Sequence, residues 1–430
     1  MEGRALPDPA DAPRARGLPL SGLPRYAAFA AILSAAGLPI YIHAPRFYVD
    51  SYGVTLAQLS VALFALRLID VVQDPLLGRL AEMTRARRAA MVAGAGSIMA
   101  VSMVALFAVP PLLPPVWWFA LSLAGLFTSF SFLTICFYAQ GVTKAEDLGS
   151  AHVRLAAWRE TGALAGVCVA AILPTALAFT GAPFALYAGI FVIAVLVAIT
   201  LMAPEWRATG TEAPSTGLRA ILRDGPARWL LAVALLNATP VAVTSTLFLF
   251  FVIDRLEAPG MEGPLLLLFF VSAAASAPLW GRIAQSQGPR RTLMAAMVLA
   301  IVTFAFALTL GAGDVAAFAV ICVASGAAMG ADLTLLPALF ARRMATIAPS
   351  GADGFGLWAF VTKLTLAFAA IALFPALEAA GLNTGGESPD AALTLLTLLY
   401  AGLPLALKAA ALAALALAPI SDERQETRHA

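Results

Sequence analysis

Long apolar runs recur through this chain of 430 residues, and they limit its possible folds more than any other feature. A helix needs about 20 mostly apolar residues to cross the roughly 30 Å of hydrocarbon in a bilayer. Twelve such runs can be marked, with approximate centres at Leu38, Ala65, Ala100, Phe130, Val167, Val192, Val243, Ser272, Thr303, Ala328, Ala367 and Leu405. The pattern predicts an all-α membrane protein with twelve transmembrane helices.

The composition excludes most other classes of protein. Hydrophobic residues make up 61% of the chain and charged residues 12%, whereas a soluble domain is about 25% charged. A net charge of +2 supplies no basic surface for nucleic acid, so we expect the lipid bilayer and no nucleic acid among its partners. The three cysteines lie inside apolar runs, which is typical of small buried hydrophobes.

The longest internal polar stretch lies between the sixth and seventh apolar runs and divides the chain near its middle. We therefore predict a cytoplasmic tail over 1–25, a six-helix bundle over 26–204, a cytoplasmic linker over 205–228, a second six-helix bundle over 229–420 and a tail over 421–430. Arginine and lysine are concentrated in the segments that would share one side with the N-terminus. Loops rich in these residues stay in the cytoplasm, which predicts a multi-pass protein of the bacterial inner membrane with both termini inside.

A short repeat relates the two halves. The segments 78–88 and 281–291 follow the second and eighth runs, and five of their eleven positions are identical. Such a repeat favours two parallel, pseudo-symmetric halves with a binding site between them near the membrane midplane. Basic turns this short also resemble one another by accident, and that alternative stays open.

Four polar residues interrupt the second apolar run. Arg67, Asp70, Gln73 and Asp74 fall on one face of a helix, although each charge at the bilayer centre costs roughly 2.5 to 3.5 kcal/mol. Two carboxylates one turn apart, with an amide beside them, offer several oxygens to Na⁺ or a proton. Alternatively, Arg67 and Asp70 are only an i,i+3 ion pair that fixes helix packing.

Further polar residues occur in the other runs. A hydroxyl stripe in the fourth run includes Ser131, and it either completes the oxygen shell or serves as a helix-packing surface. Asp332 and Lys363 are opposite charges in the tenth and eleventh runs; a static pair between them is favoured over an exchange in which Lys363 contacts the second-run aspartates. Lys408 is expected near the membrane interface, with its ammonium extended toward water.

The stretch RLIDVVQDPLLGRL resembles the glycoside-pentoside-hexuronide:cation symporters, the melibiose-carrier group of the major facilitator superfamily. Members carry an R-x-x-D-x-x-x-D-P-x-x-G pattern, matched here by Arg67, Asp70, Asp74, Pro75 and Gly78. The resemblance implies the major facilitator fold and a cation site made by Asp70, Asp74 and Gln73, with Ser131 nearby. It also implies coupling or gating roles, for which the candidates here are Arg67, Asp332, Lys363 and Arg159.

The sequence departs from this family at the sugar site. The aspartates that hold sugar hydroxyls in helices one and four are replaced by Ser34 and Thr134. Substrate identity is therefore open, and the candidates for lining the solute cavity are Ser34, Tyr41, Thr134, Tyr138, Asn237 and Trp358.

Together these features predict a transporter and not an enzyme. We expect a monomer that carries a small polar solute, sugar or glycoside-like, together with Na⁺ or H⁺ by alternating access, with no cofactor beyond that ion. The alternative is an efflux or lipid/amphiphile carrier on the same fold. An aspartyl protease is disfavoured because Asp70 and Asp74 lie on one helix and cannot face each other.

Overall fold

The computed structural model describes residues 22–147, 151–206, 217–348, 350–381 and 389–419, and within these ranges its regular elements are all helices. The longer helices are α1 (Leu23–Ala35), α2 (Leu38–Tyr52), α3 (Leu56–Met83), α4 (Arg88–Phe107), α5 (Pro115–Asp147), α6 (His152–Ala176), α7 (Pro183–Met202), α9 (Gly225–Phe250), α10 (Glu262–Gln287), α11 (Pro289–Ala305), α12 (Val315–Ile347), α13 (Ala352–Ala379) and α15 (Leu403–Leu417). The shorter ones are α8 (Gly217–Arg223) and α14 (Asp390–Thr397), and a π-helical turn, Leu398–Gly402, joins α14 to α15.

These helices fit the predicted twelve crossings. Among the described residues, nine helical segments are long and apolar enough to span a membrane by length and composition. The other three crossings are α3 and α13, each of 28 residues, and the consecutive pair α1 and α2. Charged residues such as Asp70 and Asp74 lower the apolar character of α3, which begins at a capping box formed by Thr55 and Gln58.

The first crossing differs from the single helix expected around Leu38. Helix α1 ends at Ala35 and α2 begins at Leu38, with Gly37 outside helical geometry between them. Pro39 lies in the first turn of α2, where its missing amide hydrogen costs nothing. The crossing is therefore a broken helix. The predicted linker also contains a helix, α8, whereas most of both predicted tails lies outside the described residues.

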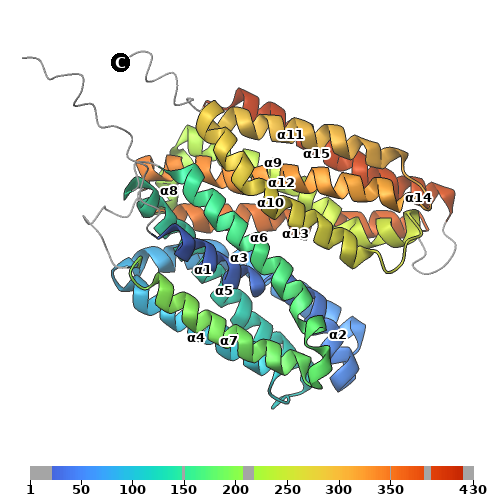
Figure 1. Ribbon diagram of the computed structural model, residues 1–430, viewed down its shortest axis with the longest axis horizontal. Helices are drawn as coiled ribbons and strands as arrows, with labels where there is room; N and C mark the ends of the chain where they lie inside the picture. Colours follow the sequence, from blue (N-terminus) through green and yellow to red (C-terminus); the bar gives the residue numbers. More distant parts are fainter. Residues whose placement is uncertain (1–21, 148–150, 207–216, 349, 382–388, 420–430) are drawn as a thin grey trace, which may run out of the picture.

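The helices form two bundles, α1 to α7 and α9 to α15 (Figure 1). In Figure 1 the bundles lie against each other at the end where α8 lies, which we call the α8 side, and diverge toward the end where α2 and α14 lie. Each bundle has its own buried apolar core. The α3 and α13 helices make one of the most extensive contacts between the bundles.

Small residues allow this close approach on the α8 side. A methyl group added at Gly356 would lie 2.9 Å from the carbonyl oxygen of Asp74 and 2.9 Å from the Cα of Gly78. The Arg79 guanidinium lies 3.7 Å from a carboxylate oxygen of Asp353, which adds an ion pair across the same contact. The α8 side is therefore the closed side of the molecule in this conformation.

Candidate cation and solute site

A lysine from the second bundle reaches the acidic residues of the first. Lys363 Nζ on α13 lies 2.8 Å from Asp70 Oδ1 and 3.0 Å from Asp74 Oδ2, both on α3. It also donates a hydrogen bond of 2.6 Å to Ser131 Oγ on α5. Asp74 is 0% exposed, Ser131 2% and Asp70 5%, so the contacts are shielded from solvent. Three helices thus contribute to one buried ionic cluster.

Two neutral side chains extend this cluster. Gln73 donates from Nε2 to Asp70 Oδ1 at 3.2 Å and accepts a bond of 2.9 Å from the Thr128 hydroxyl. Ser131 donates to the same oxygen of Asp70 at 3.0 Å. The four residues expected to bind the cation, Asp70, Gln73, Asp74 and Ser131, therefore do come together. Two hydroxyls of the fourth run, those of Thr128 and Ser131, face this cluster.

The cluster joins two carboxylates to one ammonium, so these three groups carry a net charge of −1 when all are ionised. Lys363 Nζ donates to Asp74 Oδ1 at 3.2 Å and lies 3.0 Å from Asp74 Oδ2, so the ammonium meets both oxygens of this buried carboxylate. The arrangement suits one small monovalent cation. Arg67 lies one turn before Asp70 and is half-buried.

The static pair expected between Lys363 and Asp332 is wrong. Asp332 on α12 instead forms an ion pair with Lys408 on α15, which also donates to Asn237 Oδ1 on α9 at 2.6 Å. Lys408 is only 6% exposed and pairs with Asp332, so the expected extension of its ammonium toward water is wrong as well. Sequence position indicates poorly how deeply a lysine lies, because its long stem can place the ammonium on either side of its Cα.

A cavity of about 310 Å³ is lined by α9, α12 and α13 of the second bundle and by Tyr138 on α5 of the first. We call it the central cavity, and polar or aromatic side chains contribute to its lining together with alanine, valine, leucine, methionine and proline residues. The polar and aromatic members are Tyr138, Asn237, Asp332, Trp358, Thr362 and Thr365. A mostly apolar lining with a few placed polar groups is typical of small-molecule sites.

The candidates for contacting solute divide into two groups. Tyr138, Asn237 and Trp358 line the central cavity, whereas Ser34 and Thr134 are not among its described lining residues. The side chain of Tyr41 lies outside what the structure describes. Thr362 and Thr365 were missed, although their spacing from Trp358 is the i+4 and i+7 pattern of one helix face.

Arg159, an expected coupling residue, lies behind the cavity wall. Its Nε donates a 2.8 Å hydrogen bond to Glu160 Oε1, and its guanidinium lies 3.7 Å from the centre of the Tyr138 ring. The Tyr138 hydroxyl donates to the same glutamate oxygen at 3.0 Å. The opposite charges of Arg159 and Glu160 balance, so this group fixes the Tyr138 ring without adding net charge beside the cavity.

Solved structures of transporters share this architecture. A bacterial homologue of the iron transporter ferroportin, in an outward-facing state, superimposes with a TM-score of 0.68 at 17% identity, over 92% of this chain and 98% of the other. The Escherichia coli fucose:proton symporter gives a TM-score of 0.66 at 12% identity, over 93% and 99% of the two chains. At these identities the similarity establishes the fold alone. A comparison with curated proteins found no match.

Sequence similarity to a family extends over nearly the whole chain. The family described as MFS/sugar transport protein matches residues 25–422, which include both bundles and the ionic cluster around Asp70. Its members are transporters and not enzymes. The match extends over both bundles of the transporter fold, so the chain belongs to the MFS/sugar transport protein family.

Proposed function

We propose that this protein is a secondary active symporter, which carries a small polar, sugar-like solute together with Na⁺ or H⁺ by alternating access. The observation that carries the proposal is the contact of Lys363 with Asp70, Asp74 and Ser131. In the absence of the coupling ion, the ammonium would hold the place of a cation between the carboxylates. When the ion binds, it would take over part of that contact and weaken the hold on Lys363.

Helix α13 supplies the link between ion and solute. Lys363 contacts the α3 carboxylates, whereas Trp358 and Thr362 of the same helix line the central cavity. A rigid helix that moves when Lys363 changes partners also moves these two cavity residues. Each ligand would then change the affinity for the other by the same factor, as thermodynamic linkage requires.

An inward gradient of the coupling ion would set the direction of transport. If the α8 side faces the cytoplasm, the protein is closed toward the inside in this conformation. We expect it to act as a monomer in a bacterial inner membrane. Solute and cation would then enter from outside. Rearrangement of the bundles about the α3 and α13 contact would release both inside.

Uptake by proteoliposomes tests this proposal. A Na⁺ gradient and a pH gradient are imposed separately, and accumulation of sugars, glycosides and organic acids is measured. We expect one gradient to drive solute uphill, with ion entry that depends on solute. Equal uptake with and without either gradient would refute symport.

The apolar part of the central cavity favours a second candidate, an efflux or lipid/amphiphile carrier. Val241, Met329 and Leu366 are among its lining residues and suit an aliphatic ligand. Counterflow experiments that compare sugars with alkyl amphiphiles separate the two functions. Exchange of amphiphiles alone would favour the second.

A further inference from the structure

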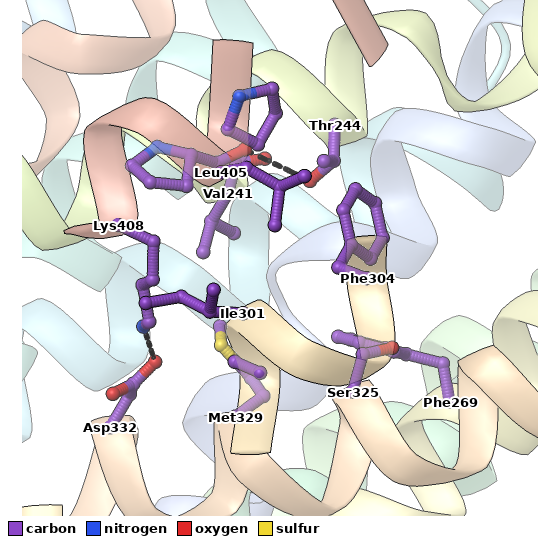
Figure 2. Close-up of a pocket in the computed structure, with 13 residues that line it drawn as sticks. Val241, Thr244, Phe269, Ile301, Phe304, Ser325, Met329, Asp332, Leu405 and Lys408 are labelled. Atoms are coloured by element: carbon purple, nitrogen blue, oxygen red, sulfur yellow. Dashed lines mark hydrogen bonds and ion pairs between the residues drawn. The ribbon is translucent and has the colours of Figure 1, made fainter. Parts of the chain in front are cut away.

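Lys408 lies behind the wall of the central cavity. It extends from α15 to Asp332 on α12, and in Figure 2 the two side chains meet at the edge of a second, mainly apolar pocket inside the C-terminal bundle. Lys408 lines that pocket, whereas Asn237 and Asp332 line the central cavity. Val241, Met329 and Asp332 line both spaces, so the partition between them is thin.

The ammonium determines how Asn237 presents its amide. An ammonium only donates hydrogen bonds, so the Asn237 atom 2.6 Å from Lys408 Nζ must be the carbonyl oxygen. The amide NH₂ is then the part of Asn237 that remains to donate. Asn237 and Lys408 are each 6% exposed, and burial fixes this orientation because the reversed amide would place N–H groups against a cation.

The Lys408 ammonium hydrogen-bonds one carboxylate oxygen of Asp332 and does not hydrogen-bond the other. Oδ2 accepts from Lys408, whereas Oδ1 is buried and has no hydrogen-bond partner among the described residues. Asp332 is 7% exposed. Helix α12 therefore contributes an acceptor that has no hydrogen-bond partner among the described residues, and α9 contributes the amide donor of Asn237; both residues line the central cavity.

A donor and an acceptor on one cavity wall match a hydroxyl-bearing solute, since each hydroxyl both donates and accepts. Charge narrows the class further. Asp332 is the one acidic or basic residue in the described lining of the central cavity, and Lys408 neutralises it. An ionic solute buried there would lack a compensating charge, which is costly in a low-dielectric site. The Trp358 ring provides an apolar surface for the C–H face of a ring-shaped solute.

We propose that Asn237 and Asp332, oriented by Lys408, form a solute-binding edge in the C-terminal bundle, and that its ligand is a neutral polyhydroxy compound. The inference rests on the proposed function and assigns its solute site. In the symporters that this chain resembles, the carboxylates that hold sugar hydroxyls lie in helices one and four, where this chain has Ser34 and Thr134. The proposal places the hydroxyl-binding carboxylate on α12 instead. Lys408 is a positioning residue, because it touches Asn237 and Asp332 and not the cavity.

Ligand binding to the purified full-length protein tests this site without any ion gradient. The probes are xylitol, sorbitol, myo-inositol, D-xylose, D-glucose and methyl glucoside, with gluconate and glucosamine as charged comparators. We expect wild type to bind at least one neutral probe and to prefer it to both charged ones. The double variant Asp332→Asn/Lys408→Met removes both charges at nearly constant volume and should weaken that binding on the order of 10- to 100-fold.

Further variants separate binding from folding. Asn237→Leu leaves the Lys408–Asp332 ion pair in place and should also weaken binding, by about tenfold. Lys408→Arg keeps a cation and should retain most of the affinity. Lys144→Met is the matched control, because Lys144 pairs with Glu205 at 2.9 Å and lies outside the cavity lining described above.

Several results would overturn the inference. These are wild-type affinity in both the double variant and Asn237→Leu, a preference for gluconate or glucosamine, or no binding of any neutral probe. The outcomes also separate the two proposals. Gradient-driven uptake of a charged solute would leave symport intact and refute this site, whereas neutral-probe binding without gradient-driven accumulation would leave the site intact and refute symport.

Discussion

Replacing Asp74 by asparagine is the sharpest perturbation of the ionic cluster. The substitution keeps the shape of a side chain that is 0% exposed and changes the charge shared by Asp70, Asp74 and Lys363 from −1 to zero. A carboxylate 3.0 Å from a monovalent charge, as Asp74 Oδ2 is from Lys363 Nζ, contributes about 5.5 kcal/mol at an effective dielectric constant of about 20. If desolvation cancels about half, the loss corresponds to about 100-fold in cation affinity.

Two assays on Asp74→Asn measure this loss. Cation-dependent thermal stabilisation of purified protein should require about 100-fold more Na⁺ or H⁺ than in wild type. In proteoliposomes, gradient-driven accumulation should disappear, whereas solute exchange at equal concentrations should persist, because exchange needs no net ion movement. Asp314→Asn makes the same chemical change at an exposed carboxylate and should behave as wild type. Undiminished accumulation by Asp74→Asn would refute the role of the cluster.

Other predictions concern the Lys363 ammonium, the contact between the bundles and the linker. Lys363→Met should tighten cation binding at least tenfold and slow solute turnover, because the carboxylates lose their competing ammonium; titration of stabilisation against Na⁺ or pH checks this. Gly356→Ala should open the α8 side, since its methyl group would meet backbone 2.9 Å away, and cysteine labelling on that side should rise. The Arg343 guanidinium, which hydrogen-bonds Asp224 at 2.9 Å, lowers the pKa of that carboxyl. The lowered pKa stabilises the folded protein at pH values above the ordinary aspartate pKa, and this stabilisation is lost as the pH falls through the lowered pKa. Asp224→Asn should therefore lower the free energy of unfolding by about 1 to 3 kcal/mol at pH 7, and by progressively less below about pH 4. Thermal unfolding at a series of pH values measures this difference.

The grouping of the acidic residues in the ionic cluster could be predicted from sequence because its core lies on a single helix. The spacing of Asp70, Gln73 and Asp74 fixes their common face before any tertiary contact is known. Charged residues inside an apolar run also indicate that they have partners, since burying an isolated charge in the membrane is unfavourable. Local periodicity therefore carried most of the information for this half of the site.

The partners across helices could not be predicted in the same way. Lys363 and Lys408 each require a carboxylate, but the sequence does not state which of Asp70, Asp74 and Asp332 each one meets. That choice depends on how α13 and α15 pack, which is a tertiary property. The break at Gly37 could have been predicted more readily, because a glycine and a proline two residues apart are local signals for an interrupted helix.

Gly356 packs closely against the main-chain carbonyl of Asp74, so Asp74 serves two purposes through different atoms. The Asp74 carboxylate belongs to the proposed ion site, and the Asp74 main chain belongs to the contact between α3 and α13 that closes the α8 side. A carrier redesigned with its acidic pair one turn further along α3 would keep the charges but separate them from that contact. We would expect such a protein to leak ions without moving cargo.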